Sequence, residues 1–351
     1  MKKNFLNGRI VERYKIWFLI PLCILLVSAF VFLGFGISST VNASNAGAKP
    51  GEAVLGGIND GFNIGIDFEG GTMLTIKMPG TAEEFDKNYN SNVNELKSII
   101  VNNGGKISYV QKSTNGEIIL KCDAFDEKQE NTIKDAIVAK FTDIDRDSDI
   151  ASTTITATAS KDLVLTAVIS IIVSTILILI YVIIRFEFWS AISAVIALTH
   201  DVLMMLALTV IFRVQINSSF IAAIITIVSY SINATIVLFD RVRENYKIVK
   251  PGSDLKEYNR AMCNKSIKET FTRNINTTVT TLVAITVLAI IGAASIREFA
   301  LPVIFGLVVG CYSSMVISPS IFCLLKNRFS KATRPQKTKK VKKAKEVKEL
   351  A

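Results

Sequence analysis

SYSINATIVLFDRVREN, residues 229–245, is apolar over its first two thirds, yet serine, asparagine and threonine side chains interrupt it. It then ends abruptly in charged residues that begin with the pair Asp240-Arg241. A helix that spans a bilayer must turn its polar side chains toward protein or a water-filled cavity, because lipid offers them no hydrogen bonds. We therefore expect a membrane helix inside a bundle with a polar core, ending at a charged membrane surface.

The rest of the chain is typical of a polytopic α-helical membrane protein. Half of its 351 residues are hydrophobic, and the mean hydropathy of +0.40 is too high for an ordinary soluble protein. A helix needs about 20 apolar residues to cross a bilayer. Six segments meet this length, and we expect six spans near residues 16–37, 162–184, 189–211, 219–240, 276–296 and 300–325.

Charge is segregated along the chain in a pattern that predicts its orientation. Three basic clusters, at residues 1–15, 241–273 and 326–351, carry net charges of +4, +5 and +9. With six spans, all three lie on one side of the membrane, which the positive-inside rule makes the cytoplasm. Residues 37–158 carry a net charge of −7 and then lie outside. Both termini are therefore predicted to be cytoplasmic and residues 38–158 extracytoplasmic.

The first span, within residues 1–37, is open to two interpretations. A basic start and a weak cleavage-like site at Val41-Asn42-Ala43 are compatible with a signal peptide. The apolar run is longer than a typical signal core, which favours a retained transmembrane helix. Both interpretations place the following segment outside.

The segment between the first two spans divides into a lead-in and a folded head. Residues 38–60 are rich in Ser, Gly, Ala and Asn and are predicted to be a flexible linker. Residues 61–158 predict an α+β domain with the element order βαββαβ, which is that of the ferredoxin-like fold; a generic α+β domain is the alternative. Its first helix is expected over 82–101, with Thr81 as N-cap. The fold class is thus a polytopic membrane protein with one ferredoxin-like extracytoplasmic domain.

The remainder of the chain is predicted to be a five-helix bundle, residues 159–325, with a basic cytoplasmic loop at 241–273. Residues 326–351 are rich in lysine and almost free of apolar side chains, which predicts a disordered tail. The tail serves as a topology signal with affinity for anionic lipid, or alternatively contacts another charged partner. A nucleic-acid role is not expected, because no aromatic residue for base stacking follows Phe329.

Two titratable residues are predicted near the middle of the membrane. His200 and Asp201 lie about twelve residues into the third span, and Asp201 shares a helix face with Ser190, Ala194 and Ala197. A stripe of small residues predicts close helix packing, and an ionisable group within it is a functional candidate by default. The alternative is a structural aspartate held by hydrogen bonds.

Three further polar groups are candidates in the bundle. Asn233 shares a helix face with Ser229 and Asp240, and the pair Asp240-Arg241 forms either a solvated interfacial pair or a salt-bridge hub against neighbouring helices. Arg273 begins a polar stripe that enters the fifth span, and its side chain either reaches the surface or points inward. In the sixth span, the spacing of Gly306 and Gly310 predicts a packing face.

The sequence contains no pattern that indicates an enzyme. It has no phosphate-binding loop, no zinc-protease motif and no Ser/His/Asp arrangement. Its five cysteines form no CxxC pair, and a single histidine excludes a multi-histidine metal site. We expect no cofactor and no catalytic residues.

Taken together, these segments resemble the SecF branch of the SecD/SecF family, within the resistance–nodulation–division superfamily. The resemblance covers nearly the whole chain and includes the order of one span, an external head and five spans. Four local motifs carry it: Asp67-Phe68-Glu69-Gly70-Gly71, Ala197-Leu198-Thr199-His200-Asp201, Ser229–Asn245, and Arg273 with Asn276–Thr281.

One position departs from the family pattern. Family members commonly have an aspartate directly after the asparagine of the fourth-span motif, where it is implicated in proton conduction. Here Asn233 is followed by Ala234, and the motif begins with Ser229 rather than glycine. The membrane carboxylate therefore does not carry over, whereas Arg273 matches the family's membrane arginine.

The resemblance implies a subunit that assists protein export across the bacterial plasma membrane. Its partners would be SecD, the SecYEG channel and the translocating polypeptide. The head would bind the polypeptide, and the proton motive force would drive the movement of the head. Because Ala234 replaces the usual aspartate, an uncoupled structural partner of SecD is the first alternative. A small-molecule exporter of the same superfamily is a remote one, since its external region would be much larger.

Overall fold

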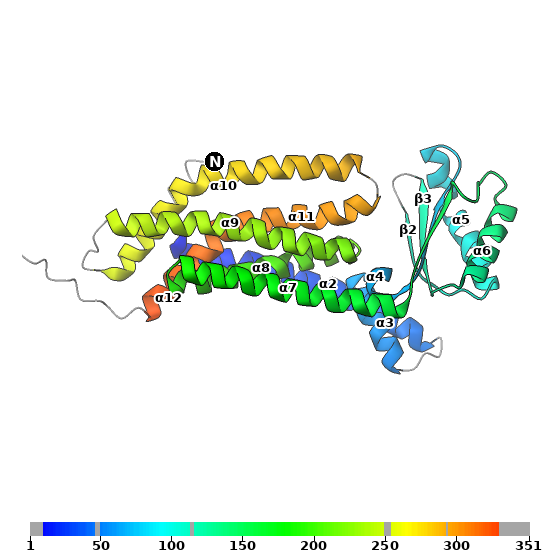
Figure 1. Ribbon diagram of the computed structural model, residues 1–351, viewed down its shortest axis with the longest axis horizontal. Helices are drawn as coiled ribbons and strands as arrows, with labels where there is room; N and C mark the ends of the chain where they lie inside the picture. The colour runs from blue at the N-terminus through cyan, green and yellow to red at the C-terminus, as the bar shows by residue number, and fades with distance from the viewer. Residues whose placement is uncertain (1–9, 46–49, 113–115, 249–253, 293, 330–351) are drawn as a thin grey trace, which may run out of the picture.

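The computed structural model describes residues 10–45, 50–112, 116–248, 254–292 and 294–329. It consists of a long helical bundle with an α+β head at one end (Figure 1). We call this end of the bundle the head end and the opposite end the tail end. The described residues contain six helices long and apolar enough to cross a membrane, as the sequence predicts.

The bundle is built from long helices that are joined by short connections. A 3-10 turn, η1 (Val11–Arg13), leads into the first long helix. The helices are α2 (Tyr14–Asn45), α7 (Ala157–Arg185), α8 (Phe188–Ile211), α9 (Ser218–Ile248), α10 (Leu255–Ile291) and α11 (Ala294–Tyr312), the last continuing through a π-helical turn, η2 (Ser313–Ile317), into α12 (Ser318–Phe329).

Helices α8, α9 and α11 pack against one another at the centre of the bundle. Glycine allows this close approach: a Cβ atom added to Gly306 would collide with Ile227, and one added to Gly310 would lie 3.3 Å from the Cβ atom of Ser231. The predicted small-residue face of the sixth span is therefore a packing face. Helices α2, α7 and α10 lie at the periphery, where many large apolar side chains are exposed.

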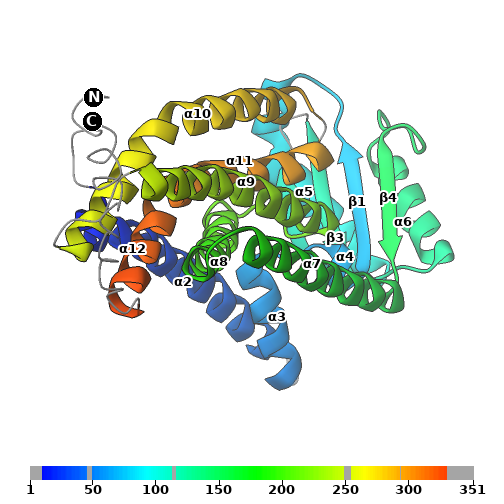
Figure 2. The same cartoon turned by 60° about the vertical axis from the view of Figure 1, so that its left-hand side comes forward.

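The head is a four-stranded antiparallel sheet with two helices on one face (Figure 2). Its strands lie in the order β2-β3-β1-β4, and Leu74 of β1 is paired with Leu120 of β3 and Ser152 of β4. The elements are β1 (Gly71–Lys77), α5 (Ala82–Asn102), β2 (Ile107–Lys112), β3 (Glu117–Cys122), α6 (Glu127–Lys140) and β4 (Ile150–Ile155).

The core of the head lies between the sheet and its two helices. Leu74 and Leu120 are fully buried against Leu96 of α5 and Ile133 of α6. Thr81 caps α5 as predicted, because its hydroxyl accepts from the Glu84 amide while the Glu84 carboxylate accepts from the Thr81 amide.

An acid of α6 ties that helix to the edge strand β4. Glu130 accepts hydrogen bonds from Lys134, at 2.8 Å, and from Ser152. The bond from Lys134, and then that from Ser152, hold the pKa of Glu130 below its ordinary value.

The prediction of a flexible linker over residues 38–60 is wrong for the residues that the structure describes. Helix α2 continues to Asn45, and a second helix, α3 (Pro50–Phe62), folds back along it. Gly57 lies so close to Gly36 and Thr40 that it has no room for a side chain. Small residues that indicate flexibility by composition here permit close contact between two helices. Residues 46–49 lie outside the described part of the chain.

The predicted basic loop at 241–273 is also largely helical. Helix α9 runs on to Ile248 and α10 begins at Leu255. Buried polar contacts stabilise this extension: the Asn245 amide donates to Ser266 at 2.9 Å and to Glu269 at 2.8 Å. Of the tail predicted to be disordered, residues 326–329 belong to α12, and residues 330–351 lie outside the described part.

Candidate functional site

Asp201 of α8 lies at the centre of the bundle and is completely buried. Its Oδ2 atom accepts hydrogen bonds from Ser231 of α9 and from Ser313 of the π-helical turn η2, the latter at 2.7 Å. Its Oδ1 atom lies 2.9 Å from Nδ1 of His200. Three membrane helices therefore meet at one carboxyl group.

This arrangement brings a carboxyl group and an imidazole into contact in the interior of the bundle, and ionisable pairs of this kind within a membrane are candidates for proton relays. Nε2 of His200 is buried, with no hydrogen-bond partner among the described residues. The same contacts also satisfy the structural alternative, because two hydroxyl groups compensate for burying the carboxyl group.

The small-residue stripe predicted the position of Asp201 correctly, but not its partners. Ser190, Ala194 and Ala197 are all buried on the Asp201 face of α8. In the sequence, Ser231 is only one of several polar interruptions of an apolar run, and no pattern distinguishes Ser313. The hydroxyl of Ser313 reaches Asp201 from a π turn, which is a local widening of the helix often found at functional sites. No sequence pattern indicates that turn.

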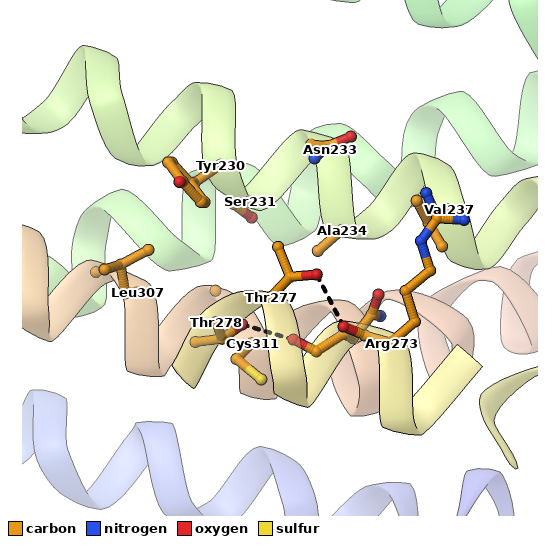
Figure 3. Close-up of a pocket in the computed structure, with 13 residues that line it drawn as sticks. Tyr230, Ser231, Asn233, Ala234, Val237, Arg273, Thr277, Thr278, Leu307 and Cys311 are labelled. Carbon is orange, nitrogen blue, oxygen red and sulfur yellow. Dashed lines mark hydrogen bonds between the residues drawn. The ribbon is translucent and has the colours of Figure 1, made fainter. Parts of the chain in front are cut away.

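A second polar region lies between α9, α10 and α11, where a cavity of ≈ 120 Å³ opens (Figure 3). This volume holds several water molecules, since one needs at least about 15 Å³. Asn233, Ala234 and Arg273 contribute to its lining. The amide nitrogen of Asn274, another lining residue, is buried without a partner among the described residues.

Asn233 and Arg273 are both exposed on the surface of the bundle. No described ion pair includes Arg273. Ser229 is exposed on the same side of α9, whereas Ser231 and Thr235 face the bundle interior. The predicted grouping of Ser229 with Asn233 is therefore an outward-facing surface and not part of the core.

This outward surface continues along α10. Its exposed polar side chains are Asn276, Thr277 and Thr280, and the hydroxyl of the half-buried Thr281 lies 2.9 Å from that of Tyr230 on α9. We call this surface, formed by Ser229, Tyr230, Asn233, Arg273, Asn276, Thr277, Thr280 and Thr281, the polar face.

Asp240 and Arg241 contact two different neighbouring helices rather than each other. Asp240 lies 3.5 Å from the guanidinium of Arg185 at the end of α7. Arg241 pairs with Glu269 of α10 at 2.7 Å and with Glu244 at 2.6 Å. This matches the salt-bridge hub and not the isolated interfacial pair. Exposed pairs of this kind each contribute only about 0–1 kcal/mol to stability.

The motif at residues 67–71 forms the junction between the head and the bundle. The motif begins within α4 (Ile66–Glu69), a single helical turn. The Asp67 carboxylate accepts from the backbone amide of Ser218 at 2.8 Å, which places a negative charge at the N-terminus of α9. Phe68 packs against the core of the bundle.

The other end of the same motif connects to the sheet of the head. Glu69 pairs with Lys121 of β3, whose buried ammonium also donates to the Ile64 carbonyl at 2.7 Å. Gly70 and Gly71 have φ angles of 82° and 127°, which other residues rarely adopt. A Cβ atom on Gly71 would also come within 2.5 Å of the Cys122 carbonyl oxygen. Both glycines are therefore required by the backbone geometry.

Comparison with known proteins gives consistent matches to one family. The model for the family described as protein export membrane protein SecD/SecF, C-terminal, matches residues 136–328. The protein translocase subunit SecF of Sebaldella termitidis is 34% identical over 282 residues, which are 79% of this chain and 86% of that protein. The SecDF subunit of Bacillus subtilis is 33% identical over 78% of this chain, which spans 36% of that longer protein.

A solved structure has the same fold. The crystal structure of SecDF from Thermus, described as a translocon-associated membrane protein, aligns with 92% of this chain and 39% of its own, with a TM-score of 0.71 and 24% identity. The segment that the family model matches, residues 136–328, includes Asp201, Arg273 and the whole of the π-helical turn. The chain belongs to the SecD/SecF family of protein export membrane proteins.

Proposed function

We propose that this chain is a subunit of a SecDF complex that assists export of polypeptides through the SecYEG channel. The relatives named SecF and SecDF support this role. The observation that carries it is the polar face, because the charged Arg273, which is in no described ion pair, is costly to leave against lipid. A second membrane subunit, SecD, would cover that face and supply an acid to pair with Arg273.

The orientation that fits this role has the head outside the cell and the tail end in the cytoplasm. Helix α12, whose last turn contains Lys326 and Arg328, lies at the tail end, opposite the head (Figure 1). The positive-inside rule favours the cytoplasm for this end. The head would then be free to contact the emerging polypeptide. Its strand order β2-β3-β1-β4, with the element order βαββαβ, supports the ferredoxin-like class.

The proton motive force is the proposed energy source. One charge that crosses 100 mV releases about 2.3 kcal/mol, which is enough to bias a head between two orientations. Within this chain, Asp201 with His200 is the proposed proton-binding pair, because Ala234 provides no carboxyl group. The remaining acids of the path would come from SecD. An uncoupled structural role remains the competing function, and it is favoured by the absence of a carboxyl group at 234.

The test uses the complete complex in membrane vesicles that lack the native subunits. We expect Arg273→Gln to slow the late phase of translocation of a secreted protein when a proton gradient is present. The matched control is Arg243→Gln, because Arg243 is exposed and, among the described residues, its guanidinium donates only to a backbone carbonyl, that of Arg185 at 3.5 Å.

Two outcomes separate the proposed function from its alternatives. If collapse of the proton gradient leaves late translocation unchanged, the complex is an uncoupled scaffold. If Arg273→Gln and Arg243→Gln behave alike in both translocation and association with SecD, the polar face is not the partner surface. Asp201→Asn should slow the same phase, and unchanged kinetics would remove Asp201 from the mechanism.

A further inference from the structure

The hairpin formed by α3 and the end of α2 projects from the bundle at the head end (Figures 1 and 2), while the rest of α2 packs against α8. Its two helices pack on each other through small residues, with Gly57 against Gly36 and Gly61 against Phe32. The Asp60 carboxylate accepts a hydrogen bond from Ser39, so the charge of Asp60 is turned into the hairpin. The inner face of α3 is thus already occupied.

The opposite face of α3 is apolar and exposed. Val54, Leu55 and Ile58 have exposed fractions of 51%, 62% and 42%. The neighbouring surface of α2 adds Ile37 at 59% and Val41 at 49%. Apart from glycine, every side chain of α3 that the structure describes as exposed is apolar. Water would be a poor solvent for such a continuous surface.

The position of this face along the bundle matches the boundary of the membrane. After α3 ends at Phe62, Ile64 forms a parallel β-bridge with Ile216, which lies in the turn between α8 and α9. The apolar run of α2 covers residues 16–37, and about 20 helical residues span the hydrocarbon core. Residue 37 and the facing part of α3 therefore lie where the core gives way to head groups.

The apolar face is also continuous with a surface that meets lipid. Further along α2, Phe30 and Leu33 have exposed fractions of 80% and 52% within the membrane span. The same side of the helix leads directly to Ile37 and Val41 without a described charged residue between them. A helix with one apolar face at this depth lies in the membrane interface rather than across it.

We propose that the apolar face of the α2–α3 hairpin is a lipid-binding surface in the interface of the membrane leaflet at the head end. Acyl chains would cover Val54, Leu55 and Ile58, while the polar residues of the hairpin contact one another and the bundle. The hairpin would thereby hold the segment that enters the head at a constant depth in the membrane. This inference concerns the lipid contact alone and does not depend on the export function.

The experiment measures the environment of a nitroxide label at Leu55→Cys. Cys23 is the exposed cysteine among the described residues, so Cys23→Ser serves as the background. The full chain is reconstituted in vesicles of phosphatidylcholine and phosphatidylglycerol. Collision of the label with oxygen, which concentrates in lipid, is compared with collision with a water-soluble nickel chelate.

Two reference labels define the scale. Phe30→Cys reports the lipid-facing middle of α2, and Val101→Cys reports an apolar residue, 60% exposed, on helix α5 of the head. We expect the oxygen-to-nickel ratio at position 55 to exceed that at 101 several-fold and to approach that at 30. A ratio equal to that at 101 would place the face in water. An immobilised label that neither reagent reaches would show that protein covers it, and either result overturns the proposal.

Discussion

Replacing Asp67 with alanine should loosen the head from the bundle without unfolding either one. The Asp67 carboxylate caps α9 through the Ser218 amide at 2.8 Å. A side-chain cap contributes about 0.5–2 kcal/mol, and the favourable interaction of a carboxylate with a helix N-terminus adds about 0.3–1 kcal/mol. Because Asp67 is half-buried, we take a net loss of about 1 kcal/mol, which corresponds to roughly fivefold more frequent opening of the junction.

Hydrogen–deuterium exchange can measure this opening directly. The amide of Gly65 donates to the Ile216 carbonyl at 2.7 Å, and the amide of Ile216 donates to Asn63 at 3.0 Å. Both bonds connect the segment that leads to the head with the turn before α9. We expect peptides that contain these amides to exchange about fivefold faster in Asp67→Ala, since exchange follows the opening equilibrium.

Two further variants make the measurement specific. Asp126→Ala removes the same kind of cap from α6 within the head, where the carboxylate accepts from the Gln129 amide at 2.7 Å, and it should leave the junction peptides unchanged. Ser218→Pro deletes the donor at a helix position that tolerates proline. If Asp67 acts through this bond, the double variant should exchange little faster than Asp67→Ala. Unchanged exchange in Asp67→Ala would refute the reasoning.

Three other variants test the bundle and the head. Ser313→Ala removes a hydrogen-bond donor from buried Asp201 and should lower the free energy of unfolding by about 1–3 kcal/mol. The control is Ser314→Ala, because the Ser314 hydroxyl donates to a backbone carbonyl. The melting temperature of Ser313→Ala in detergent should be lower than that of Ser314→Ala. Glu130→Gln should destabilise the head at neutral pH, because a lowered pKa means that the ionised form stabilises the fold. That difference should vanish as pH falls from the ordinary value of about 4.3 through the lowered one, and a difference that persists in acid would contradict it. Ala234→Asp places a carboxyl group in the cavity with Arg273 and should increase the dependence of translocation on the proton gradient, whereas equal dependence would exclude a role for the cavity.

The six spans and the elements of the head could be predicted from the sequence because each depends on local periodicity or length. The sequence did not predict which face of α9 points into the bundle. Ser229 and Asn233 lie on one side of that helix, while Ser231 and Thr235 lie on the other. Both sides carry polar side chains: one side packs inside this bundle, and the other is the exposed polar face, which we propose a second subunit covers. Periodicity within one chain cannot distinguish the two.

Two other features escaped prediction for different physical reasons. Composition indicated a flexible linker before the head, yet small residues such as Gly36 and Gly57 also allow two helix backbones to touch. Whether such residues form a flexible linker or a close helix–helix contact depends on whether a second helix packs against them. The contact between Ser313 and Asp201 depends on a widened helical turn, and the hydrogen-bonding pattern of that turn follows from packing rather than from the residues within it.

The π-helical turn at Ser313–Ile317 lies within the continuous helix formed by α11 and α12. Because the turn contains one more residue than an α-helical turn, the helix can change its length there. Conversion of that turn to a regular α-helix by a one-residue shift would rotate the following helix by about 100° and displace it by about 1.5 Å along its axis. Lys326, which pairs with Glu187 at 2.8 Å before the start of α8, would move with it. Such a shift would therefore change two contacts together, the hydrogen bond from Ser313 to Asp201 in the interior of the bundle and the pairing of Lys326 with Glu187 at its tail end.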